Sequence, residues 1–211
     1  MCSGVRTLYL NGAFDPLDKY THVIVRVFYF FCYNTLMLKL ELKDTEYPYT
    51  YIDHDRYIVR GIIYDEEGYF YFAKIHRDDI FVKNSDFIET SGGGVEAGED
   101  LIAAIKRELK EELGMDVEVN DQIGIVDDYY NTIHRHNINN YFLCKALEIG
   151  ENHQTKEEQE IFHLSTLRIT YEEALKEYDR LAINGLGRLL RNREVPIIKE
   201  AYRLLKEKTR I

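Results

Sequence analysis

One stretch of the sequence joins a glycine-rich segment to a run of clustered carboxylates. It reads Gly93-Gly94-Val95-Glu96-Ala97-Gly98-Glu99 and continues, after seven further residues, as Arg107-Glu108-Leu109-Lys110-Glu111-Glu112-Leu113-Gly114-Met115. From Asp100 to Leu113 apolar residues recur at intervals of three and four, which predicts an amphipathic helix. Glu99 and Asp100 lie at its start, where the helix dipole favours acidic groups. Gly114 lies where a glycine commonly ends a helix.

The acidic residues of this predicted helix share one face. Glu108, Glu111 and Glu112 stand at positions i, i+3 and i+4. Like charges at this spacing repel one another, and a hard divalent cation would offset the repulsion. Mg²⁺ prefers a few carboxylates together with water and substrate phosphate oxygens. The glycine backbone just before the helix can approach an anion or lend a carbonyl to a metal. The residues therefore indicate a Mg²⁺ site for phosphate chemistry, the alternative being a solvated acidic face.

The same stretch resembles the Nudix box, G-x5-E-x7-R-E-U-x-E-E-x-G-U, in which U is a bulky aliphatic residue. All nine specified positions are filled, by Gly93, Glu99, Arg107, Glu108, Leu109, Glu111, Glu112, Gly114 and Met115. The resemblance implies an α/β fold, a Nudix-like α/β/α sandwich with a mixed β-sheet. It places the domain over residues 37–211, with a core at about 55–211.

The resemblance also implies a reaction and roles for individual residues. The reaction is Mg²⁺-dependent hydrolysis of a nucleoside diphosphate linked to another group, such as ADP-ribose, a nucleotide sugar or a nucleoside triphosphate, with Mn²⁺ as the alternative ion. Arg107 would orient the neighbouring glutamates, with Glu99 as its partner, and Gly93 and Gly114 would be structural. The expected metal ligands are Glu108, Glu111, Glu112 and the Gly92 carbonyl. A non-catalytic nucleotide-sensing module on the same fold is the alternative function.

The general base and the substrate contacts are less closely defined. The family uses either the glutamate after the arginine, here Glu108, or a glutamate of a later loop, for which Glu157 is our preferred residue. In the segment 129–136 we expect Tyr129 to stack on a base and Arg135 to contact a phosphate. His134 and His136 alternate, so they would share one face of a strand.

The rest of the chain predicts an ordinary α/β arrangement around this motif. A hairpin is expected from strands at 56–64 and 69–75, with Gly68 in the turn. Further short or regular strands are expected at 81–82, 87–88, 117–126 and 140–149, and helices at 171–178 and 196–206. Pro196 would lie in the first turn of the last helix, where its missing N–H costs nothing.

Composition limits the possible partners and location. The 211 residues include 37 acidic and 27 basic ones, for a net charge of −10, so we expect a small-molecule nucleotide substrate and no nucleic acid. The three cysteines form no CxxC pair, which favours reduced thiols in the cytoplasm. The longest stretch without a charge has 12 residues, too short to span a membrane. A homodimer is compatible with the sequence.

The first 36 residues differ from the remainder in charge. They carry five charged residues, whereas the other 59 lie after residue 36. We interpret residues 1–36 as an N-terminal extension of uncertain order, upstream of a native start at Met37. The alternative is an additional N-terminal strand or a membrane-associating segment.

Overall fold

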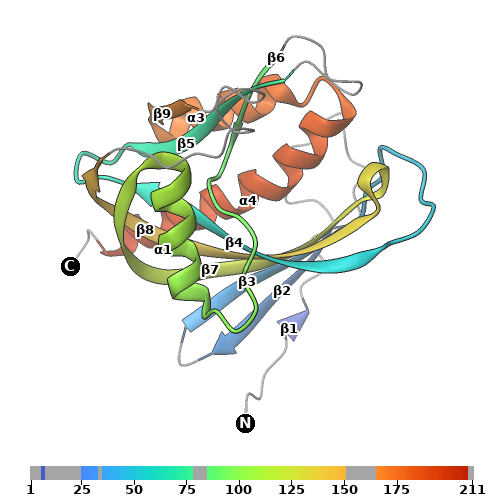
Figure 1. The fold of residues 1–211 in the computed structure, drawn as a ribbon, viewed down its shortest axis with the longest axis horizontal. Helices are drawn as coiled ribbons and strands as arrows, with labels where there is room; N and C mark the ends of the chain where they lie inside the picture. Colours follow the sequence, from blue (N-terminus) through green and yellow to red (C-terminus); the bar gives the residue numbers. More distant parts are fainter. Residues whose placement is uncertain (1–5, 8–24, 33–34, 78–84, 151–164, 209–211) are drawn as a thin grey trace.

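The computed structural model describes residues 6–7, 25–32, 35–77, 85–150 and 165–208 of the chain (Figure 1). The elements are, in order, β1 (Arg6–Thr7), β2 (Val25–Cys32), β3 (Thr35–Leu42), β4 (His54–Tyr64), β5 (Phe70–Arg77), β6 (Ser85–Glu89), α1 (Leu101–Leu113), β7 (Met115–Tyr130), the 3₁₀ turn η1 (Asn131–Ile133), β8 (Arg135–Ile149), β9 (Ser165–Ile169), α3 (Tyr171–Leu181) and α4 (Gly185–Lys208).

The described strands form one mixed sheet between two helical layers. Its order is β1-β2-β3-β7-β8-β4-β5-β6, and β9 pairs with β5 beside this path. The β3–β7 and β4–β8 pairs are parallel, and the other pairs are antiparallel. In Figure 1, α1 lies on the near side of the sheet, while α3 and α4 lie together on the far side. The arrangement confirms the expected α/β/α sandwich.

Each helical layer buries its own apolar core against the sheet. On one face, Ile105 and Leu109 of α1 pack with Val59 of β4. On the other face, Tyr178 of α3 and Ile197 of α4 pack in a larger cluster. All five side chains are fully buried, and burial of each such group contributes about 1.5–3 kcal/mol relative to exposure. The two cores hold α1 and β4 in a fixed relation, which matters for the site below.

Helix α1 begins and ends as its sequence predicts. The Asp100 carboxylate accepts hydrogen bonds of 3.0 Å from the backbone N–H groups of Ile102 and Ala103, which caps the first turn. Gly114 adopts the left-handed conformation at φ 67°, and its N–H donates to the carbonyl of Lys110. These two caps confirm the helix predicted over 100–113.

The strands match the expected pattern but extend further. The β4–β5 hairpin is confirmed, and β6 includes the expected strand at 87–88, whereas 81–82 lies outside the described residues. Strands β7 and β8 are longer than predicted because polar residues continue their ladder. Asp128 and Asn139 are buried, and the Asn139 amide donates to the Asp128 carboxylate at 2.7 Å. The partner satisfies each group, so neither ends its strand.

The prediction that Pro196 opens the last helix was wrong. Helix α4 begins at Gly185, after Asn184, whose side chain accepts the Gly187 N–H at 2.8 Å, and Pro196 lies inside it. A proline there removes one helical hydrogen bond at a cost of about 3 kcal/mol. Burial of the flanking Val195 and Ile197 stabilises the helix through this point.

The N-terminal part of the described chain adds strands at one edge of the sheet. Strand β2 pairs antiparallel with β3 along its whole length, from Val25 opposite Leu42 to Cys32 opposite Thr35. The proposed native start at Met37 stays a prediction. Within the described ranges, no helix is both long and apolar enough to cross a lipid bilayer.

Candidate active site

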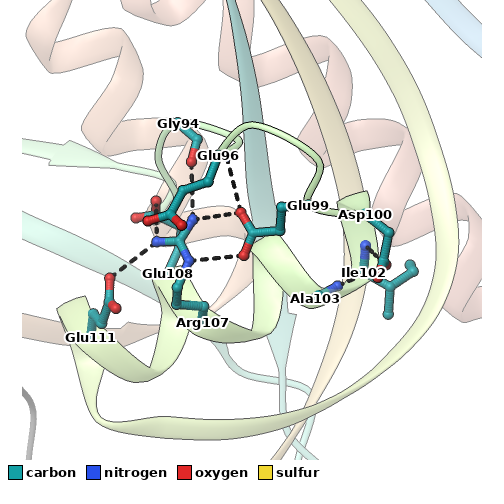
Figure 2. Close-up of polar contacts among 9 residues, drawn as sticks. All are labelled: Gly94, Glu96, Glu99, Asp100, Ile102, Ala103, Arg107, Glu108 and Glu111. Atoms are coloured by element: carbon teal, nitrogen blue, oxygen red, sulfur yellow. Dashed lines mark hydrogen bonds and ion pairs between the residues drawn. The ribbon is translucent and has the colours of Figure 1, made fainter.

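Arg107 connects the glycine-rich loop to the acidic face of α1 (Figure 2). Its Nε and Nη2 each donate to one carboxylate oxygen of Glu99, both at 2.9 Å. Its Nη1 donates to Glu108 at 2.8 Å and to Glu111 at 3.2 Å. Nη2 also donates to the Gly94 carbonyl at 3.1 Å. One guanidinium therefore fixes the loop and orients two carboxylates, which confirms the expected pairing with Glu99.

The close contacts keep these groups charged. Hydrogen bonds from Arg107, and then from the Glu96 backbone N–H, lower the pKa of Glu99 to about 2. The same hydrogen bond to Glu99, with the further contact to Glu108, raises the pKa of Arg107 above its ordinary value. The contacts with Glu99 and Glu108 are well shielded, because the exposed fractions of their side chains are 15% and 13%. Glu111 is more open, at 47%.

The glycine loop runs alongside β4 and reaches the end of α1. The carbonyls of Ser91 and Gly93 accept hydrogen bonds from β4 at 2.9 and 3.0 Å. The N–H of Gly92 donates to Glu112 Oε2 at 3.0 Å. A Cβ atom on Gly93 would lie 2.3 Å from Glu108 Oε2, so any larger residue would displace that carboxylate. The loop and the carboxylates of α1 thus form one compact unit.

The donor set suits a hard divalent cation. Glu108, Glu111 and Glu112 offer carboxylate oxygens, and the bare backbone at Gly93 leaves room beside Glu108. In the arrangement described, however, Glu108 and Glu111 turn to Arg107, and no three carboxylate, histidine or cysteine side chains of the described residues converge as a metal site. Mg²⁺ and Mn²⁺ need few protein ligands when water and substrate phosphates complete the shell. The chemistry of these residues fits such an ion, and the role of the Gly92 carbonyl stays a prediction.

A cavity of about 180 Å³ lies beside the loop. Strands β4, β7 and β8, the turn η1 and helix α4 all contribute to its lining. Its charged and aromatic side chains are those of four arginines, one glutamate and two tyrosines: Arg56, Arg60, Arg135, Arg193, Glu89, Tyr47 and Tyr130. Two arginines connect it to the loop. Arg60 Nη1 donates to the Thr90 carbonyl at 2.8 Å, and Arg56 Nη2 lies 3.4 Å from the position that a Cβ of Gly94 would take.

The structure separates the residues that were expected to contact substrate. Arg135 lines the cavity, but Tyr129 lies outside it and stacks on His136 with ring centroids 4.3 Å apart. The neighbouring Tyr130 lines the cavity instead, because side chains alternate along β7. Glu157 lies outside the described residues, so its role as base stays a prediction.

The prediction that His134 and His136 share a strand face was wrong. Strand β8 begins only at Arg135, and His134 ends the preceding 3₁₀ turn with φ 54°. Its ring stacks on Tyr51, with centroids 4.1 Å apart. A turn in the left-handed conformation therefore interrupts the alternation that the two positions suggested.

Three arginines of the cavity were missed by the sequence analysis. Arg56 and Arg60 are separated by an even number of residues within a mostly apolar strand, a spacing that places them on one face. This spacing in the sequence could have identified the two arginines as neighbours on one face of the strand. No sequence pattern predicted that Arg193 lines the cavity, since it lies on α4, far from β4 in the sequence.

Comparisons with known proteins agree with this geometry. The family model of the NUDIX domain matches residues 54–184. A NUDIX hydrolase from Nitrosomonas europaea has a similar structure, with TM-score 0.54, 14% identity, and coverage of 72% of this chain and 90% of that one. The MutT protein from Methanosarcina mazei Go1 gives TM-score 0.50 and 18% identity, with 72% and 96% covered. No curated protein matches the chain.

The matched region spans more than half of the chain and contains both the Arg107 site and most of the cavity lining. The chain therefore belongs to the NUDIX family, and it is a NUDIX hydrolase, with the pyrophosphohydrolase type of activity that this domain supports in general.

Proposed function

We propose that this NUDIX hydrolase uses Mg²⁺, or Mn²⁺ in its place, to hydrolyse a nucleoside diphosphate linked to another group. Substrates of this class include ADP-ribose, nucleotide sugars and nucleoside triphosphates. The observation that carries the proposal is the position of Arg107, which holds Glu99, Glu108 and the Gly94 carbonyl together at 2.8–3.1 Å. An acidic helix face without such a function would not need an arginine to hold like charges next to the glycine loop.

The proposed roles follow from what each side chain contacts. The carboxylates of Glu108, Glu111 and Glu112, with the Gly92 carbonyl, would hold the ion. When bound, the ion supplies charge neutralisation of the diphosphate and activation of water. Arg107 is a positioning residue, because it reaches the reaction only through the carboxylates that it orients. Glu108 or Glu157 would accept the proton of the attacking water, and Arg135 would contact the substrate from the cavity. The Tyr129 contact with a base is also kept as a proposal, although its ring lies outside the cavity.

A turnover assay tests the proposal. The full chain would be given ADP-ribose, nucleotide sugars, dinucleoside polyphosphates and nucleoside triphosphates, each with Mg²⁺, with Mn²⁺ and with chelator. Glu112→Gln serves as the inactive variant, and Glu118→Gln, on exposed β7 surface, removes one carboxylate without touching the site. We expect metal-dependent cleavage of one compound class, lost in Glu112→Gln and retained in Glu118→Gln.

The opposite result has a clear meaning. Nucleotide binding by the folded protein with no cleavage of any compound would contradict the proposal. That outcome would favour a nucleotide-sensing module on the same fold.

A further inference from the structure

Some residues that line the cavity beside the loop carry buried polar atoms without a hydrogen-bond partner. Among the described residues, six buried side-chain nitrogen or oxygen atoms have no hydrogen-bond partner. Two of the six, Arg135 Nε and Asn137 Oδ1, belong to residues of this cavity, and a third, Arg193 Nη2, lies 2.7 Å from Glu194 in an ion pair. An unsatisfied buried polar group costs about 1–3 kcal/mol, so two such groups on residues of one cavity favour a ligand that satisfies them. The cavity also far exceeds the roughly 10–15 Å³ that a single water molecule requires.

The charged side chains that line the cavity indicate the chemical class of its ligand. We call Arg56, Arg60, Arg135 and Arg193 the arginine pocket. Glu194, which is fully buried, lies 2.7 Å from Arg193 and balances its charge. Within the part of the chain that the structure describes, the other three arginines form no ion pair with a carboxylate.

More distant acidic groups compensate part of this charge, because Tyr141, Glu194 and Glu89 outweigh burial and Arg193 and raise the pKa of Arg60. Arg60 donates to neutral oxygens, those of Asn139 Oδ1 and the Thr90 carbonyl, at 3.1 and 2.8 Å. Burial, followed by repulsion from Arg135 and Arg60, lowers the pKa of Arg56. The guanidinium groups therefore crowd one another, and an anion between them would relieve that repulsion.

We propose that the arginine pocket binds a phosphate group that the substrate carries in addition to the diphosphate that is hydrolysed. The inference rests on the proposed function and narrows its substrate class to compounds with a further phosphate. Planar guanidinium groups match phosphate oxygens with paired hydrogen bonds. Three arginines that lack a carboxylate at ion-pair distance suit a doubly charged phosphate better than a monocarboxylate or a neutral base. The unpartnered Asn137 oxygen is an acceptor, so it suits a hydroxyl elsewhere on the substrate and not the phosphate itself.

The position of the pocket supports a link to the reacting diphosphate. Arg56 lies against Gly94, and the Gly94 carbonyl accepts a hydrogen bond from Arg107. Arg56 therefore lies between the pocket and the carboxylates of α1. A single substrate can place its diphosphate at those carboxylates and its further phosphate among the arginines.

Calorimetric titration of the full chain in the presence of chelator tests the inference without turnover. The probes are inorganic tripolyphosphate, acetate as a singly charged anion, and adenosine as a neutral base. We expect tripolyphosphate to bind at least about tenfold more tightly than acetate or adenosine. Because a hydrogen bond to a charged group contributes about 1.5–3 kcal/mol, Arg135→Gln should weaken tripolyphosphate binding about tenfold or more. Arg56→Gln serves as the second variant, should Arg135→Gln fail to fold.

The matched control is Arg203→Gln, which removes an exposed arginine of α4 that pairs with Glu200 and Glu207. It should leave tripolyphosphate binding unchanged. Equal affinity for tripolyphosphate and acetate would overturn the inference, as would an equal loss of binding in the Arg203 variant. Preferential binding of adenosine, lost in Arg135→Gln, would instead identify a base pocket.

The two proposals fail separately. Metal-dependent turnover with no phosphate binding in chelator would leave the proposed function standing and remove the arginine pocket from it. Phosphate binding without any turnover would contradict the proposed function and leave the arginine pocket as an anion-binding site only.

Discussion

Arg107 and Glu99 form a paired hydrogen bond, with both carboxylate oxygens accepting at 2.9 Å from two nitrogens of one guanidinium. The two residues are eight positions apart, one in the loop and one in the second turn of α1. The remaining nitrogen of Arg107 contacts Glu108 at 2.8 Å and Glu111 at 3.2 Å. The loop and the carboxylates that would hold an ion are therefore fixed by one side chain (Figure 2).

Arg107→Lys should reduce activity far more than stability. Lysine keeps the charge but cannot make the paired contact and reach Glu108 together. Misplacement of the carboxylates by about 1 Å would lower kcat/KM by about 100-fold. Steady-state kinetics and thermal unfolding measure the two effects. Lys106→Gln, which removes an exposed cation one residue earlier, is the control, and equal activity of the two variants would contradict the assigned role.

The Glu99 carboxylate should make the free energy of unfolding depend on pH in the acidic range. Its pKa is lowered from 4.5 to about 2 by the hydrogen bonds from Arg107. A lowered pKa in the folded state stabilises the protein above the unfolded value, and this stabilisation is lost as pH falls toward about 2. The difference in unfolding free energy between wild type and Glu99→Gln should thus be full at pH 6 and shrink below pH 4.5. Denaturant unfolding at several pH values measures it, and a constant difference would refute the assignment.

Gly93→Ala should remove activity while the fold is retained. The added Cβ would lie 2.3 Å from Glu108 Oε2, so the carboxylate must move. We expect a loss in kcat of about 100-fold. Gly94→Ala is the matched comparison, since its nearest neighbour would be Arg56 Nη2 at 3.4 Å. Kinetics of both variants test this difference, and a larger loss in Gly94→Ala than in Gly93→Ala would be inconsistent with it.

The buried Arg193–Glu194 pair should be needed for stability. Glu194 accepts hydrogen bonds from Thr90, Tyr141 and Arg193 at 3.0, 3.1 and 2.8 Å. Glu194→Gln removes the closest carboxylate of the buried Arg193 and leaves only Asp128 and Glu89, at 3.6 and 3.7 Å. Removal of one partner of a buried ion pair costs about 3–5 kcal/mol. Urea unfolding measures the loss. Glu207→Gln, on the exposed end of the same helix, should cost less than about 1 kcal/mol, and comparable losses in the two variants would disprove the prediction.

The parts of the fold that local chemistry determines were predictable from the sequence. The cap at Asp100, the glycine at 114 and the spacing between them define α1, and the turn before Gly68 defines the β4–β5 hairpin. Helix α4 was not predictable in full, because Arg193 and Glu194 look like surface residues until Tyr130 and Tyr141 are seen to contact them.

The carboxylate half of the site was predictable for the same reason, since its residues lie within one motif. The arginine pocket was not. Parallel pairing of β4 with β8 brings Arg56 beside Asn137, which is 81 positions later, and packing of α4 adds Arg193. No local spacing encodes such a contact, although the alternation of Arg56 and Arg60 was a partial signal.

The measurement that tests the central claim most directly is Mn²⁺ binding to the folded protein, followed by electron paramagnetic resonance of the free ion. The wild-type chain would be titrated beside Glu108→Gln, Glu112→Gln and the control Glu118→Gln. Our account predicts saturable binding in wild type and the control, weakened about tenfold or more in both helix variants, since each removes a charged ligand. Equal Mn²⁺ affinity in all four proteins, or none in any of them, would contradict the assignment of a metal to the carboxylate face of α1.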